Sequence, residues 1–204
     1  QQLQKDVFGF VQQRRAVLAG AAHVAEVAVL HSQDHLMGDR LQFFPDPAAR
    51  KERAEPFEGA SRMFMHHARH YTAISTATLE RRKGDYRVII VPETEYLNDA
   101  TMDALEQYVK NGGALLVTQS SNEAGVNTRL LALAGVKHEG VSPLNYLYFD
   151  VKGGEPLSAN GKWSLVKPAG DAHEIVRAIM PLKAGKGGAK FGHAAEVLGH
   201  AAHV

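Results

Sequence analysis

The sequence predicts an α/β fold in which a mostly parallel sheet lies between layers of helices. Residues 85–122 read DYRVIIVPETEYLNDATMDALEQYVKNGGALLVTQSSN, which combines a buried strand, a helix and a second buried strand. That succession is the repeating unit of a parallel sheet. Over residues 26–135, other apolar runs alternate with helical patterns in the same way. The strands should therefore be parallel neighbours that are joined by right-handed crossovers.

The N-terminal part begins with a predicted helix. Over residues 3–18 the apolar residues recur at three- and four-residue steps, and Gly20 can end this helix. The sequence EVAVLH at residues 26–31 predicts the first buried strand, and the polar segment SQDHLMGDR follows it. Residues 43–57 contain three prolines and a cluster of charges, so they predict a loop.

A helix, a strand and a polar connection are expected next. Residues 58–70 predict the helix, and the β-branched segment YTAIST at residues 71–76 predicts the second strand. The segment LERRKGDY reads as a polar connection to the third strand, VIIV, at residues 88–91.

Local signals define one helix especially well, from Asp99 to Lys110. Asn98 is a suitable N-cap, and Asp99 lies near the positive end of the helix dipole. Gly112 and Gly113 can end the helix. The residues that should face the core are Met102, Leu105 and Val109. Residues 114–118 then predict the fourth strand.

Beyond the fourth strand the pattern becomes richer in strands. Residues 127–134 predict a short helix that Gly135 ends. Residues 145–151, 162–167 and 190–198 predict strands, and residues 171–179 predict a short helix. We expect these segments to form a β-rich extension of the sheet domain.

The composition excludes several classes of protein. The 204 residues carry a formal net charge of +1, which gives no long-range field to attract nucleic acid or an anionic membrane. No apolar run approaches the roughly 18 residues of a spanning helix. The first residues lack a signal-peptide pattern, which slightly favours the cytoplasm but leaves the compartment open. The absence of cysteine excludes disulfides and thiolate chemistry. We expect no cofactor.

Polar residues follow three of the predicted strands. In parallel sheets, ligands bind just beyond the carboxyl ends of the strands. A candidate crevice for a ligand at this edge consists of Ser32, Gln33, Asp34, His35, Glu93, Glu95, Gln119, Ser120 and Asn122.

The same residues leave two catalytic alternatives open. Ser120 follows the fourth strand, but its neighbours are Gln119 and Ser121, and the G-x-S-x-G pattern of a nucleophile elbow is absent. Glu93 and Glu95 could act as acid and base in a small hydrolase or amidase, as paired carboxylates do in glycoside hydrolysis. A sugar-binding module that uses the crevice is the third reading.

The remaining chemical groups give weaker signals. His66, His67 and His70 lie on one predicted helix, but no carboxylate completes a metal site, so we expect none. The run from Arg81 to Lys83 is too short for a nucleic-acid footprint. Residues 185–188 do not match a P-loop.

Three segments together resemble the β-galactosidase trimerisation domain, a member of the class I glutamine-amidotransferase-like superfamily. They are AEVAVLHS, the segment from DYRVIIV to SSNEAG, and NTRLLALAGV. The resemblance implies a flavodoxin-like three-layer sandwich. It also implies a linker helix over residues 1–20 from an upstream catalytic barrel, an amidotransferase-like domain over 21–140, and a β-rich extension over 141–204.

The resemblance further implies a domain that has kept the fold and lost the chemistry. In the amidotransferases, the strand that corresponds to residues 114–118 delivers a catalytic cysteine, whereas this chain has Thr118, Gln119 and Ser120 there. We therefore expect no catalytic residue. The expected role is subunit assembly and the shaping of a neighbouring active site in a glycoside hydrolase. The expected partners are the chain's own barrel and identical subunits, with carbohydrate as a further candidate and no nucleic acid or membrane.

Overall fold

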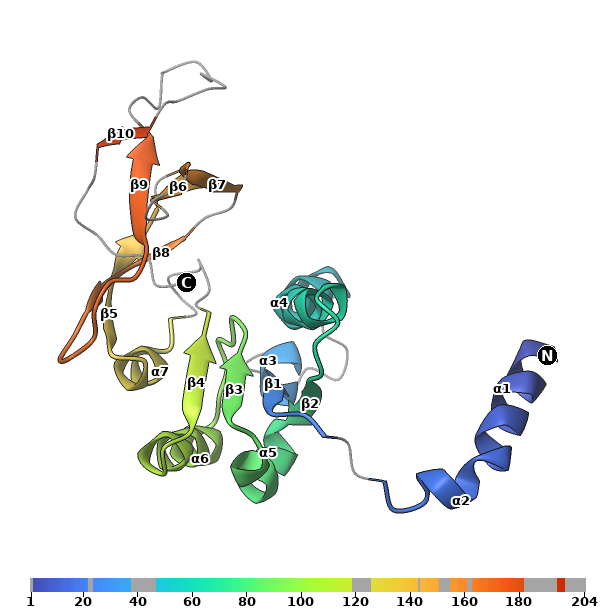
Figure 1. Cartoon of the computed structure of the whole chain (residues 1–204). Helices are drawn as coiled ribbons and strands as arrows, with labels where there is room; N and C mark the ends of the chain where they lie inside the picture. Colours follow the sequence, from blue (N-terminus) through green and yellow to red (C-terminus); the bar gives the residue numbers. More distant parts are fainter. Residues whose placement is uncertain are drawn as a thin grey trace.

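A four-stranded parallel sheet forms the centre of the computed structural model, which describes residues 2–21, 24–37, 47–118, 126–142, 144–150, 155–160, 163–181 and 194–196. The strand order is β2-β1-β3-β4 (Figure 1). The strands are β1 (Val27–His31), β2 (Thr72–Ser75), β3 (Val88–Val91) and β4 (Ala114–Val117). The predicted α/β class with a mostly parallel sheet is confirmed.

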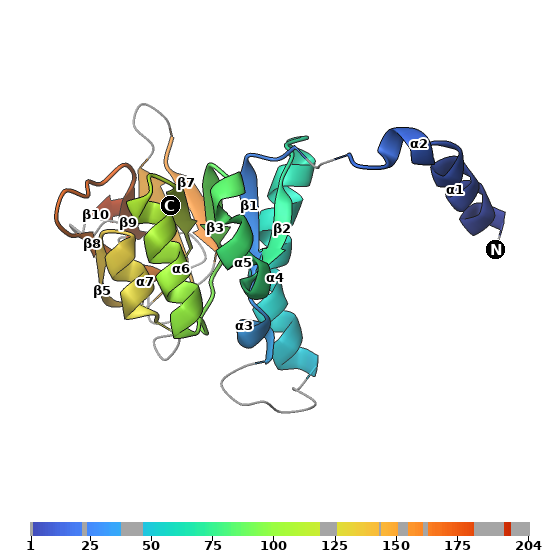
Figure 2. The ribbon, with the colours of Figure 1, turned by 90° about the horizontal axis from the view of Figure 1, so that it is seen from below.

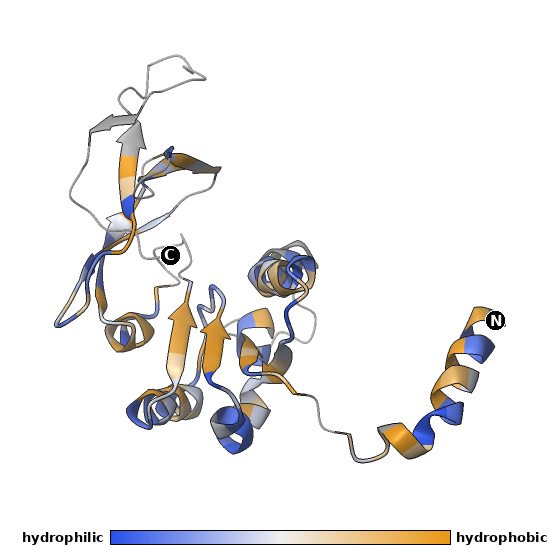
Figure 3. Cartoon of the chain, in the orientation of Figure 1, coloured by the Kyte–Doolittle hydropathy of each residue, from blue (hydrophilic) through white to orange (hydrophobic). Residues whose placement is uncertain are grey.

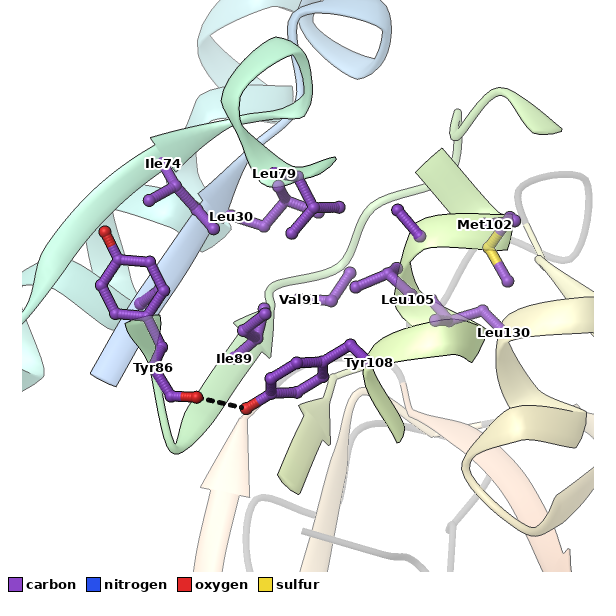
Figure 4. Packing of buried hydrophobic residues seen from close by; sticks show 12 residues of the cluster. Leu30, Ile74, Leu79, Tyr86, Ile89, Val91, Met102, Leu105, Tyr108 and Leu130 are labelled. Carbon is purple, nitrogen blue, oxygen red and sulfur yellow. Dashed lines mark hydrogen bonds between the residues drawn. The ribbon is translucent and has the colours of Figure 1, made fainter. Parts of the chain in front are cut away.

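Helices lie on both sides of this sheet. On one side are α5 (Thr76–Arg82) and α6 (Asp99–Lys110), and on the other side α4 (Pro47–His66) packs near β1, as Figures 1 and 2 show. The main core forms where α5 and α6 meet the strands (Figure 4). Leu79, Ile89 and Leu105 are completely buried there, and each such side chain stabilises the fold by roughly 1.5–3 kcal/mol.

Helix α6 has the bounds that its local signals predict. The Asn98 side chain accepts a hydrogen bond from the backbone N–H of Thr101 at 2.8 Å, as an N-cap should. The helix ends at Gly112, whose φ of 89° is readily accessible only to glycine. The ring of Tyr108 lies directly beside Gly113, and its hydroxyl donates a hydrogen bond to the backbone carbonyl of Tyr86 at 3.2 Å (Figure 4).

The predicted loop over residues 43–57 is wrong from Pro47 onward, because this part belongs to α4; residues 43–46 lie outside the described residues. Pro47 takes the first helical position, where a missing N–H costs nothing. Pro56 lies inside the helix and removes one backbone hydrogen bond. Tertiary contacts offset this loss, since the Phe57 ring packs edge-on against His31 with 4.7 Å between centroids.

Two other short helices replace expected polar segments. The connection after β2 is helical, as α5 followed by a 3₁₀ turn at Lys83–Asp85. Thr78 stabilises its start, because its hydroxyl accepts a hydrogen bond from the Ser75 N–H at 3.1 Å. The segment after β1 forms α3 (Gln33–Met37).

The C-terminal part is the predicted β-rich extension. A short helix, α7 (Thr128–Leu133), leads into it. One sheet has the order β10-β9-β6-β7 and a second pairs β5 with β8. The bounds are β5 (Val136–Val141), β6 (Tyr146–Asp150), β7 (Leu157–Asn160), β8 (Ser164–Pro168), β9 (Arg177–Pro181) and β10 (Ala194–Glu196). The predicted helix over residues 171–179 is wrong, because the last part of this segment pairs with β6 as β9. The sequence reading also missed β5 and β7.

The N-terminal residues project from the rest of the chain. Helix α1 (Gln2–Gln13) has no buried residue, and α2 (Arg15–Leu18) connects it to the residues before β1 (Figure 1). Figure 3 shows hydrophobic residues among the polar ones on this arm. Among the described residues, no helix is both long and apolar enough to cross a membrane.

Candidate functional site

The described candidate residues lie at the carboxyl ends of β1 and β3, which are neighbours in the sheet and are followed in the strand order by β4. We call this edge the crest. Ser32, Gln33, Asp34 and His35 follow β1, and Glu93 and Glu95 follow β3. Gln119, Ser120 and Asn122 follow β4 but lie outside the described residues, so the serine nucleophile is not tested.

Ser32 starts α3 and also holds the loop that follows β3. Its side chain is nearly completely buried, with 4% exposure. The hydroxyl accepts a hydrogen bond from the His35 N–H at 3.1 Å and donates one to the Tyr96 carbonyl at 3.1 Å. Because both partners belong to the chain itself, this hydroxyl has no free donor for a ligand.

Asp34 and Asn98 form a second connection across the crest. The Asn98 amide donates a hydrogen bond to the Asp34 carboxylate at 2.8 Å, while its carbonyl oxygen caps α6. One asparagine therefore ties α3 to the start of α6. Its position as an N-cap was visible in the sequence, but its second bond was not, since the two residues lie 64 positions apart.

His35 makes the third connection, and it is buried with 6% exposure. Its Nδ1 accepts a hydrogen bond from the Glu95 backbone N–H at 3.2 Å. Among the described residues its Nε2 makes no hydrogen bond of good geometry, although the Arg53 carbonyl is near. Burial lowers the pKa of His35, which outweighs the opposite effect of the Glu95 carboxylate. The ring is therefore neutral at pH 7.

Glu93 occupies an unusual backbone conformation at the end of β3. Its φ is +28°, a region that residues other than glycine rarely adopt. Its N–H donates a hydrogen bond to the Thr118 hydroxyl at 3.0 Å, which links the loop to the end of β4. Burial, and then the nearby Glu95 carboxylate, raise the pKa of Glu93. Nothing in the sequence predicted this strain, since a glutamate does not indicate a positive φ.

The described crest offers little open space. A cavity between α4 and the ends of β1 and β3 has a volume of about 10 Å³, which is about the space of one water molecule. Its lining includes Ser32, His35, Arg53, Phe57 and Thr94. A far larger depression, of about 760 Å³, lies at the opposite edge of the sheet, where β1, β3 and β4 begin. The cavity beside His35 is thus too small for a sugar.

The three histidines that were considered as metal ligands lie at and beyond the end of α4. His66 is the last residue of α4, and His67 and His70 lie beyond it, so the three do not share one helix as predicted. Within the described ranges, no three histidine, aspartate or glutamate side chains come together as a metal site.

A comparison with protein families identifies the domain. Residues 25–139, more than half of the 204, match the model of the beta-galactosidase trimerisation domain. The chain belongs to this family. The resemblance that the sequence suggested is therefore confirmed. The match runs from the residue before Glu26 to β5, so it includes the whole described crest but not α1 or the later strands.

Solved structures with the same fold are parts of glycoside hydrolases. The trimerisation domain is similar to the alpha-L-fucosidase isoenzyme 2 from Paenibacillus thiaminolyticus, with a TM-score of 0.64, 19% identity, and coverage of 95% of this chain and 29% of that one. For the GH42 beta-galactosidase Gan42B the TM-score is 0.58 at 17% identity, with coverage of 83% of this chain and 26% of that one. For the beta-galactosidase from the psychrophilic Marinomonas ef1 the TM-score is 0.54 at 12% identity, with coverage of 86% of this chain and 27% of that one.

These likenesses concern the fold alone, because every identity is below one fifth. The chain spans less than a third of the length of each of the three proteins. A comparison with curated protein sequences gives no significant match.

Proposed function

We propose that this trimerisation domain assembles subunits of a glycoside hydrolase and helps to shape a neighbouring active site, without catalysing a reaction itself. Its family membership and the glycosidases that share its fold support this proposal. The observation that carries it is the exposed apolar surface of α1.

Helix α1 displays apolar side chains that nothing in the described chain covers. No residue of the helix is buried, and the exposed fractions reach 76% for Leu3 and 72% for Phe8. Val7, Phe10 and Val11 are also exposed, by 53%, 56% and 47%. An isolated helix of 12 residues is marginally stable in water and gains most of its stability from packing. Helix α1 therefore needs a partner surface, which we propose is the chain's own barrel or an identical subunit.

The crest supports the non-catalytic part of the proposal. The polar groups of Ser32, Asp34 and His35 that could act on a substrate hold the loop after β3 instead. A catalytic base must reach the proton that it abstracts, within about 3 Å. Groups that are committed to internal hydrogen bonds cannot do so without breaking them.

Analytical ultracentrifugation of the chain tests the assembly role. We expect species heavier than the 22.2 kDa of one chain, and we expect Phe10→Asp to weaken the association. The matched control is Gln12→Asp, which places the same charge on an exposed polar position on the opposite side of the same helix from Val7 and Phe10. A single-chain mass at every concentration, unchanged by either variant, would contradict self-association through α1.

A second candidate function rests on Glu93. A carboxyl group with a raised pKa on a strained backbone is typical of an acid catalyst, so a small hydrolase or amidase remains the alternative. Assays of the purified chain with nitrophenyl glycosides and amides distinguish the two. We expect no turnover. Turnover that Glu93→Gln abolishes would establish the hydrolase and overturn the non-catalytic reading.

A further inference from the structure

His35 lies where three parts of the crest meet. The ring belongs to α3, and its Nδ1 accepts the Glu95 N–H from the loop after β3. The carbonyl and the guanidinium of Arg53 in α4 both act on its charge from the other side. A nitrogen that accepts a hydrogen bond carries no proton, so the ring is neutral with its proton on Nε2.

We propose that His35 is an acid-sensitive latch, which holds the backbone around Glu95 on α3 while the ring is neutral and releases it on protonation. A protonated imidazole has a donor on both nitrogens. Its Nδ1–H would then face the Glu95 N–H, so the hydrogen bond between them would become a contact between two donors. The new positive charge would also be buried, with 6% of the residue exposed, unless the loop moved and admitted water.

The charges around the ring set how strongly the latch responds. In the part of the chain that the structure describes, Glu95 favours the protonated ring and the Arg53 guanidinium disfavours it. Asp34, on the same helix, is engaged by Asn98. Glu93 in the same loop adds a carboxylate near Glu95, and His31 at the end of β1 packs against Phe57. The groups of opposite sign partly cancel, which leaves burial as the dominant effect.

The release is local. The Ser32 hydroxyl binds the Tyr96 carbonyl whether His35 is charged or not, and that contact keeps the loop near α3. The opening therefore concerns the backbone around Glu95. This part of the crest is the surface that a neighbouring domain could contact, so its opening would make that surface depend on pH.

Hydrogen exchange and NMR of the intact chain test the latch. An opening that takes up one proton at the ordinary histidine pKa of about 6.5 becomes about 30-fold more favourable between pH 7.5 and pH 5.0. We expect the protection factor of the Glu95 amide, corrected for the intrinsic exchange rate, to fall by about tenfold to 30-fold over this range. The imidazole spectrum should show the Nε2–H tautomer at pH 7.5.

Two variants separate the latch from general acid effects. In His35→Gln, the side-chain oxygen can accept the Glu95 N–H but does not titrate, so the protection of Glu95 should no longer depend on pH. In His67→Gln, an exposed histidine beyond α4 is lost, and the wild-type dependence should persist. The wild-type measurement decides the matter even if His35→Gln does not fold. A Glu95 amide that is equally protected at both values of pH would overturn the proposal, as would a ring that protonates at or above pH 6.5.

Discussion

The contact between Gly113 and Tyr108 gives the sharpest test of how the sheet domain is packed. A Cβ atom added at Gly113 would lie 2.2, 2.3 and 2.5 Å from three atoms of the Tyr108 ring, where real Cβ atoms are not found. The ring is 4% exposed and is held by its hydrogen bond to the Tyr86 carbonyl. It therefore cannot move aside without disturbing the core.

The magnitude follows from two losses. Overpacking of a well-packed core costs typically 1–3 kcal/mol. If the ring shifts enough to break its hydrogen bond, a further loss of about 1 kcal/mol is expected. Gly113→Ala should thus lower the free energy of unfolding by about 2–4 kcal/mol.

Urea denaturation followed by circular dichroism measures this loss. The matched control is Gly59→Ala in α4, where an added Cβ meets no atom within 4 Å and alanine is the better helix former, so the free energy of unfolding should rise by up to about 1 kcal/mol. In a Tyr108→Ala background the clash is absent, so Gly113→Ala should cost little. If Gly113→Ala costs the same in both backgrounds, the clash with Tyr108 is not the reason for the glycine.

Three further substitutions probe individual residues by the same denaturation assay. Asn98→Ala removes both the N-cap of α6 and the hydrogen bond to Asp34 and should cost about 1–2 kcal/mol, whereas Asn111→Ala, which removes neither, should cost less. Ala68→Gly should raise the free energy of unfolding by about 0.5–1 kcal/mol, because Ala68 adopts a φ of +50° just after α4. Glu93→Gln should stabilise the fold at pH 7. The raised pKa of Glu93 means that its charged form is disfavoured in the folded state. This cost is present above the folded pKa and vanishes as the pH falls to the ordinary glutamate value, so the gain should vanish at pH 4. An equal gain at both values of pH would contradict this account.

The sequence predicted best where neighbouring residues decide the structure. The bounds of α6 follow from Asn98 at one end and Gly112 at the other, and both act within one turn of the helix. The strands β1 and β3 are short apolar runs that are largely buried, so they too could be read locally. The run of β4 also forms the predicted strand, but it is not buried as expected, since Ala114 and Leu116 are exposed.

The sequence-based predictions were wrong or incomplete where contacts between distant residues determine the structure. Helix α4 contains Pro56, which favours a break, but Phe57 packs on His31 and Arg53 lies over the Tyr96 ring at 5.5 Å. Likewise, β5 has the mixed sequence VKHEGV and exists because it pairs with β8. The register of such a pair cannot be read from either segment alone.

The crest shows the same difference between what neighbouring residues determine and what distant contacts determine. The sequence predicted that the residues after β1 and those after β3 would lie together, because the ends of parallel strands share one edge, and His35 does bind the Glu95 N–H there. The predicted residues after β4 lie outside the described part of the chain. The sequence did not indicate that the residues at the crest would bind one another. The bonds from Ser32 to Tyr96 and from Asp34 to Asn98 each span 64 positions, and the positive φ of Glu93 depends on where its N–H finds Thr118.

The contrast between the crest and α1 argues for a role in contact rather than in chemistry. A reaction centre needs polar groups whose hydrogen bonds remain available until a substrate arrives. At the described crest, the Ser32 hydroxyl, the Asp34 carboxylate and the Nδ1 of His35 already have partners within the chain. In contrast, α1 exposes apolar side chains that no described residue covers. Leu3 and Phe8 are the most exposed of them. Exposed apolar area of this extent is removed from water when another macromolecular surface covers it. The exposed apolar side chains of α1 therefore support the proposed role in association.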